Sequence, residues 1–216
     1  MKNIYRIGKI DLQDDPSEHI WSRMVPINID FFPWDANHYR PRTEVRMFYN
    51  ETDFHVQFKA REPEITVSYY KMDDPVYKDS CVELFLNPCP ENGSQYINFE
   101  INPIGTMLAG IGTNKQDRKR ITSNAIKSCK VKTSITEQTV SLYNGEYWEV
   151  QLSIPFLFLE HYFGKLDFIQ GKEMQANFYK CGDESLFPHY GCWNEIKAQS
   201  PNFHCPEYFG KILLLS

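Results

Sequence analysis

The sequence feature that most constrains the fold is the alternation of apolar and polar residues within short segments. In FHVQFKA, Phe54 and every second residue after it are apolar, whereas His55, Gln57 and Lys59 are polar. Successive side chains of a strand point to opposite faces, so this pattern predicts a strand with one face in a core. The segment EVRMFY and the polar turn NETD come just before it, and together they predict a β-hairpin.

The same alternation recurs along the chain, in VELFL (82–86), YINFEIN (96–102), YWEVQLSI (147–154), QANFYKC (175–181) and KILLL (211–215). The segment PFLFLEHYF predicts one or two helical turns at most. Many short strands separated by turn residues predict an all-β fold. We therefore expect a single antiparallel, jelly-roll-like β-sandwich over residues 1–216, with about eight to eleven strands. Its predicted buried residues are Phe54, Val56, Phe58, Val82, Leu84, Phe99, Ile101, Val150, Leu152 and Leu214.

Charge and hydropathy restrict the classes of partner. The net charge of -5 argues against nucleic acid, which requires a basic surface. The local basic run from Lys115 to Arg120, which includes Arg118, predicts a solvated loop. No apolar run is long enough to span a bilayer, so we expect no contact with a membrane. The first residues, MKNIYRIGKIDLQDD, lack the apolar stretch of a signal peptide and predict a cytoplasmic protein.

The six cysteines are scattered, without a C-x-x-C pair. In a cytoplasmic protein this pattern predicts buried free thiols rather than a disulfide framework. A zinc site is an alternative, built from Cys181, Cys192 and Cys205 with His189 or His204. Its spacings match no zinc-ribbon pattern.

Two strand segments place polar groups where a sheet would otherwise be dry. Glu83 points away from the face of its apolar neighbours Val82 and Leu84, so its own face is expected to be a wet groove unless its charge is paired. Asp79, at the start of the same segment, is interpreted as a cap. In the next segment Asn98 and Glu100, together with Tyr96, form a polar stripe that would share this face if the strands pair; the alternative is an ordinary solvated outer face.

The third feature is the irregular segment between Trp193 and Phe203, which is rich in Asn, Ser and Pro. Tyr77 adds a ring in a second irregular segment, just before the strand of Glu83. Flat rings beside fixed polar groups suit an amphipathic ligand such as a pyranose. The alternative is that the loop rings cap the end of the core.

The segments DSCVELFL, YINFEINPIG, YWEVQLSIPF and CPEYFGKILL, in this order, resemble the carbohydrate-binding module family 9-like domains. The resemblance runs from about Trp21 to the C-terminus. It implies a β-sandwich that binds a carbohydrate without catalysis and that often holds a structural calcium ion. No calcium-binding loop spacing is present, so no ligands are assigned.

Carried over residue by residue, the resemblance implies a sugar held between two rings. The ring before the D-S-x-V-E strand corresponds to Tyr77, and the second ring corresponds to Phe203, with Trp193 nearby. The glutamate that bonds the sugar corresponds to Glu83. This sequence departs from the family because Tyr77 and Phe203 stand where tryptophans are expected, Cys81 lies inside the motif, and Glu100 replaces a basic residue. The predicted ligand-binding residues are Tyr77, Glu83, Asn98, Glu100, Trp193 and Phe203.

Two other functions stay open at this point. A haem- or other ligand-binding sandwich would draw on His55, His189 or His204 and a methionine such as Met107. A glycan-active enzyme would use Glu83 and Glu100 as its two carboxylates. The sequence lacks the common hydrolase, metalloprotease and phosphate-loop motifs, which favours a binding domain over an enzyme.

Overall fold

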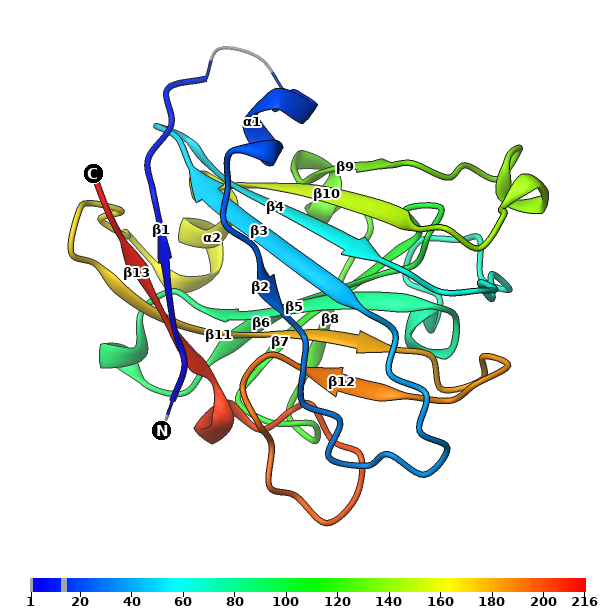
Figure 1. The fold of residues 1–216 in the computed structure, drawn as a ribbon. Coiled ribbons are helices and arrows are strands. Elements are labelled where there is room, and N and C mark those ends of the chain that lie inside the picture. Colours follow the sequence, from blue (N-terminus) through cyan, green and yellow to red (C-terminus); the bar gives the residue numbers. More distant parts are fainter. Residues whose placement is uncertain (1, 13–14) are drawn as a thin grey trace.

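The computed structural model describes residues 2–12 and 15–216. Figure 1 shows two β-sheets packed face to face, with few and short helices. Thirteen strands are found in the described residues, eight in one sheet and five in the other. The predicted all-β sandwich is confirmed as a single domain.

The eight-stranded sheet carries the candidate site. Its strands, in spatial order, are β1 (Ile4–Ile7), β13 (Gly210–Leu214), β11 (Glu173–Cys181), β5 (Cys81–Asn87), β6 (Tyr96–Ile101), β7 (Met107–Gly112) and β8 (Lys119–Ile121), and β12 (Tyr190–Cys192) also pairs with β11. All its neighbours run antiparallel except β1 and β13, which are parallel. Figure 1 shows these two strands side by side near the two ends of the chain.

The five-stranded sheet forms the second layer. Its order is β2 (Ile27–Asn28), β3 (Thr43–Tyr49), β4 (Asp53–Ala60), β10 (Trp148–Pro155) and β9 (Lys130–Thr133). The helices are α1 (Glu18–Ser22) and α2 (Phe156–Phe163), and the 3-10 turns are η1 (Val76–Lys78), η2 (Pro90–Asn92), η3 (Ala125–Ser128), η4 (Val140–Leu142) and η5 (Pro206–Tyr208). Helix α2 lies in the segment expected to form one or two turns. Among the described residues no helix is long and apolar enough to cross a membrane.

The core fills the space between the two sheets. All ten predicted core residues, including Phe58 on β4 and Leu84 on β5, are at most 1% exposed. They come from alternate positions of their strands, because only one face of each strand meets the opposite sheet. The strand number was underestimated, because β2, β8, β9 and β12 have only two to four residues each and are too short to show alternation.

The outer face of the eight-stranded sheet is also buried. Tyr96, Asn98 and Glu100 on β6 point to this face and are at most 2% exposed. They lie against a second apolar cluster that includes Phe203 from the segment between β12 and β13. The alternative of a solvated outer face is therefore wrong, because the closing loop, residues 193–209, folds over it.

Candidate functional site

The closing loop is fixed to β11 at two points. The side chain of Asn177 both donates to the carbonyl of Asn194 and accepts from its backbone N–H, each at 2.9 Å. Tyr179 donates its hydroxyl to the carbonyl of Phe203 at 3.1 Å. The two rings of this second pair stack with centroids 4.1 Å apart. The backbone groups of this irregular segment thus find side-chain partners on β11, which hold it against the sheet.

Trp193 begins the loop but faces away from the pocket. Its ring packs edge-on against Tyr5 and Phe178 of the main core, and it is 5% exposed. A Cβ added to Gly210 would meet its six-membered ring at 2.5 Å, so the ring lies directly on the start of β13. The expected clustering of Trp193 with Tyr77 and Phe203 is therefore wrong. Trp193 instead caps the core, which was the alternative interpretation of the loop rings.

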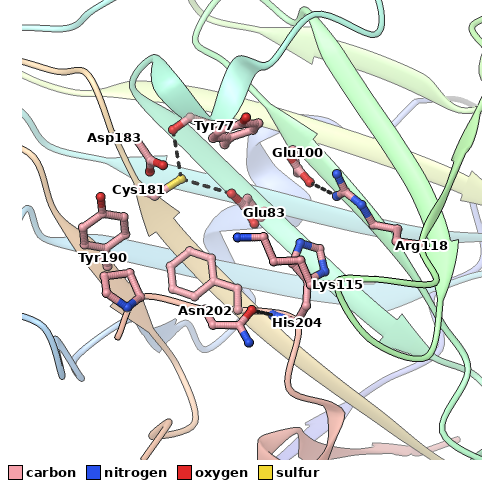
Figure 2. Close-up of a pocket in the computed structure, with 12 residues that line it drawn as sticks. Tyr77, Glu83, Glu100, Lys115, Arg118, Cys181, Asp183, Tyr190, Asn202 and His204 are labelled. Atoms are coloured by element: carbon pink, nitrogen blue, oxygen red, sulfur yellow. Dashed lines mark hydrogen bonds and ion pairs between the residues drawn. The ribbon is translucent and has the colours of Figure 1, made fainter. Parts of the chain in front are cut away.

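A pocket of about 390 Å³ opens over the outer face of the eight-stranded sheet. Four of the six predicted residues line it: Tyr77, Glu83, Glu100 and Phe203. The first three come from η1, β5 and β6, which follow one another closely in the chain, and Phe203 comes from the closing loop about a hundred residues later. Figure 2 shows Glu83 and Cys181 in the middle of the site, with Glu100 and Arg118 to one side.

The two glutamates are neighbours on adjacent strands. The register pairs Glu83 of β5 with Glu100 of β6, and both are at most 3% exposed. Burial, and next the charge of Glu100, raise the pKa of Glu83 well above its usual range. Burial also raises the pKa of Glu100, although the nearby Arg118 acts in the opposite direction. Two buried carboxyls side by side favour keeping at least one of them protonated.

Arg118 supplies the cation that the acidic pair needs. Its Nη1 lies 2.6 Å from Oε1 of Glu100, and the same oxygen accepts a hydrogen bond from the amide of Asn98 at 2.9 Å. Asn98 thus lies beside Glu100 and positions it, and it is not among the residues lining the pocket. The other oxygen of Glu100, Oε2, is buried and has no partner among the described residues.

The place of Arg118 depends on a residue without a side chain. A Cβ added to Gly110 of β7 would lie 3.1 Å from Cγ and Cδ of Arg118 and 3.0 Å from Oδ1 of Asn98. The absent side chain therefore leaves a shallow channel on the sheet, along which the arginine reaches Glu100.

Burial shifts the pKa values of other groups on the pocket wall toward their neutral forms. Burial raises the pKa of Asp183, just after β11, to about 6. Burial lowers the pKa of His204 to about 3, and its Nδ1 lies 2.7 Å from the hydroxyl of Tyr96. Cys181 donates its thiol to Oε1 of Glu83 at 3.0 Å, and burial raises the pKa of that thiol well above its usual range. The pocket is therefore rich in neutral donors and acceptors.

The rings occupy the rim. Tyr77 on η1 and Tyr190 on β12 are both half-buried and line the pocket. One face of Phe203 is covered by Tyr179, and its ring also lies near Trp34 and Tyr190, so Phe203 is 9% exposed where it lines the pocket. The closing loop thus carries one ring of the site and one core ring, because Phe203 and Trp193 lie on opposite sides of the sheet.

Eight lining residues were not predicted as part of this site: Lys115, Arg118, Cys181, Asp183, Tyr190, Pro201, Asn202 and His204. The run from Lys115 to Arg120 was interpreted as a solvated loop, and for Arg118 this is wrong because its side chain is only 16% exposed. One signal was available for Arg118: a glutamate on a buried strand requires a cation, and this run is the nearest basic segment that follows.

The residues of the haem alternative lie in separate places. His55 bonds Ser153 at 2.9 Å in the five-stranded sheet, and Met107 is in the core between the sheets. His204 faces the pocket on the other side of β6, whereas His189 contacts the buried Lys180 at 2.8 Å. No pair of these residues converges on one cavity in the described part of the chain, so this alternative gains no support.

The zinc alternative also fails in its original form. Of the described residues, Cys81, Glu83 and Cys181 alone form a group of three close enough to share an ion, which leaves out Cys192 and Cys205. All six cysteines are buried free thiols, as expected. The calcium ion that the resemblance implies finds no three converging carboxylates among the described residues, and it stays a prediction.

Comparison with known proteins settles the family. The family model described as carbohydrate-binding family 9 matches residues 18–214. The chain belongs to this family. Carbohydrate binding is therefore its general function, and the match covers the pocket and every described strand except β1, which agrees with the resemblance seen in the strand motifs.

Solved structures share the fold of this family 9 domain. A Bacteroides uniformis protein to which carbohydrate binding is ascribed has 24% identity and a TM-score of 0.85, over 99% of this chain and 100% of that one. A family 9 module from Caldicellulosiruptor kristjanssonii, in complex with glucose, has 13% identity and a TM-score of 0.64, over 98% and 95%. A family 9 module from the same organism in complex with cellotriose has a TM-score of 0.66, over 99% of this chain and 94% of that one.

A curated relative from the fungus Arthroderma benhamiae is described as an extracellular protein. It is 23% identical over 185 residues, which are 81% of this chain and 79% of the relative.

Proposed function

We propose that this domain binds a small or terminal sugar, without catalysis, in the pocket between η1, β5 and the closing loop. The observation that carries the proposal is the meeting of Tyr77, Phe203 and Glu83 in one pocket. Modules of the same family and fold hold glucose and cellotriose, which supports a sugar of this class. A volume of about 390 Å³ suits a ligand of one or two rings better than a long chain lying in an open cleft.

The chemistry of the wall matches a pyranose. The C–H face of a pyranose would stack on Tyr77 or pack against the part of Phe203 that lines the pocket, and its hydroxyls would meet Glu83 and Glu100. A protonated carboxyl both donates and accepts a hydrogen bond, and so does a hydroxyl. The raised pKa of Glu83 therefore allows it to bond a neutral sugar without burying a net charge. Oε2 of Glu100 is a further acceptor on this wall, without a protein partner in the described residues.

Calorimetric titration with glucose, xylose, cellobiose and cellotriose tests the proposal. We expect Tyr77→Ala to weaken binding by about 1–3 kcal/mol, by analogy with the stacking of nucleobases on aromatic rings. Glu83→Gln is also expected to weaken it, because the amide is a different set of donors and acceptors. Tyr147→Ala is the matched control, since Tyr147 is 40% exposed and is not part of the pocket lining.

Full sugar affinity in both Tyr77→Ala and Glu83→Gln would refute the site. Release of reducing sugar from a polysaccharide panel would instead favour the glycan-active enzyme, with Glu83 and Glu100 as its carboxylates.

A further inference from the structure

Two cysteines and a glutamate meet beneath the pocket floor. The pairing of β5 with β11 sets Cys81 directly opposite Cys181, and Glu83 lies two residues further along β5 on the same face. The two Sγ atoms and a carboxylate oxygen of Glu83 all lie within 4.8 Å of one another. The three residues are at most 3% exposed. Cys181 and Glu83 line the pocket, so the group is reached from it.

No lysine or arginine side chain is paired with this group among the described residues. Glu83 accepts the thiol hydrogen bond of Cys181, but among the described ion pairs none joins it to a lysine or arginine. Glu100, its neighbour, is paired with Arg118. Lys115 also lines the pocket and is not paired with Glu83 in the described residues. A buried carboxyl without a positive partner favours its protonated form, whereas a bound cation would stabilise the ionised form in its place.

The donor atoms select the type of ion. Two thiolate sulfurs and one carboxylate oxygen are typical of thiophilic divalent cations, above all zinc, and unlike the oxygen-only sets of calcium. Tetrahedral zinc with bonds of about 2.0–2.3 Å needs its ligand atoms roughly 3.5–3.8 Å apart. The ligand atoms of the observed group lie within 4.8 Å of one another, so binding requires them to approach by about 1 Å.

We propose that Cys81, Glu83 and Cys181 form a zinc site whose fourth position opens into the pocket. Binding displaces the two thiol protons and any proton on Glu83 into solvent, and the sulfurs and the carboxylate oxygen then bond the ion. The fourth ligand is water. Because Glu83 is shared with the proposed sugar site, bound zinc and sugar influence each other's affinity, but zinc binding itself does not require that a sugar binds.

Titration of metal-free protein with Co²⁺ and Zn²⁺ tests the proposal. We expect one ion per chain and, with Co²⁺, a sulfur-to-cobalt charge-transfer band. Cys81→Ser and Cys181→Ser should each remove this band and weaken Zn²⁺ binding by about 100-fold or more, because each removes a ligand. Cys192→Ser is the matched control: this buried thiol lies outside the group and should leave both results unchanged.

A second measurement covers the case in which a serine variant does not fold. In the intact protein, Zn²⁺ should slow alkylation of Cys81 and Cys181, located by mass spectrometry, and leave that of Cys192 unchanged. Absence of the band, unchanged affinity in a folded Cys81→Ser protein, or equal alkylation with and without Zn²⁺ would overturn the proposal. Sugar titration of the metal-free protein separates the two proposals, since sugar binding there with no zinc binding leaves the proposed function standing.

Discussion

At the scale of single residues, burial shifts the pKa values of several titratable groups in the pocket. Glu83, Asp183 and His204 are all shifted by burial toward their uncharged forms. When a neutral sugar excludes water, charged groups lose favourable hydration. Neutral donors and acceptors instead replace their hydrogen bonds to water with hydrogen bonds to the sugar hydroxyls. Of the two basic residues that line the pocket, Lys115 and Arg118, Arg118 is already paired with Glu100.

Asp183 gives a prediction of pH dependence. Its pKa rises from 3.8 in the unfolded chain to about 6 in the folded protein, so the folded state binds the proton more tightly between these values. Stability from this group is present below about pH 4 and is lost as the pH rises through about 6. Asp183→Asn should therefore raise the melting temperature relative to wild type at pH 7 and have little effect near pH 4.

The control is Asp167→Asn, which removes the same charge from an exposed position. Thermal melts of the three proteins from pH 4 to pH 8 provide the measurement. An Asp183→Asn protein whose gain in melting temperature is equal at both ends of this range would contradict the assigned shift.

At the scale of elements, the closing loop joins the two faces of one sheet. It starts with Trp193 on the core side, bonded through its neighbour Asn194 to Asn177, and continues with Phe203 on the pocket side. The ring of Trp193 fits because Gly210 at the start of β13 has no side chain. The positions of the loop and of β13 are therefore coupled.

Gly210→Ala tests this coupling. The added methyl group would lie 2.5 Å and 2.8 Å from carbons of the Trp193 ring and 3.0 Å from the carbonyl of Asn3, so the ring must shift. We expect a loss of about 1–3 kcal/mol in the free energy of unfolding, measured by urea denaturation. Gly8→Ala is the control, because its Cβ would meet nothing within 4 Å. Equal stabilities of the two variants would show that the Trp193 ring is not held against β13.

At the scale of the whole molecule, a buried polar network ties the two sheets together. Lys180 of β11 is fully buried and lies 3.2 Å from the carboxylate of Glu62, which follows β4. Trp148 of β10 donates to the same carboxylate at 2.8 Å. His189 lies 2.8 Å from the lysine Nζ, and burial lowers the pKa of this histidine to about 2, so it is neutral. The network thus crosses the core at one end.

Lys180→Met should be strongly destabilising, because it leaves Glu62 buried without a cation. The expected loss is about 3–5 kcal/mol in the free energy of unfolding. Lys211→Met is the matched control: its partner Glu173 is 2.7 Å away, but both side chains are exposed, so the loss should stay below about 1 kcal/mol. Adding Glu62→Gln to Lys180→Met should recover part of the stability, and a further loss instead would contradict this account.

The sequence by itself determined the sandwich and its core. Alternation requires only neighbouring residues, and Phe54, Leu84 and Val150 could be assigned to the core because a one-residue shift would turn them all to the opposite face of their sheets. The motif around Glu83 and the ring of Tyr77 were also predictable, since both lie close together in one segment. These features are local, and local patterns can be read without knowing which strands pair.

The tertiary structure alone decided which groups meet. The pairing of β5 with β6 and β11 brought Glu83 beside Glu100 and Cys181, and the closing loop separated Phe203 from Trp193. The contact between Glu83 and Cys181 joins residues 98 positions apart in the chain, and it depends on strand order, which alternation does not encode. Burial then set the protonation of the pocket, because the cost of a charge depends on everything packed around it.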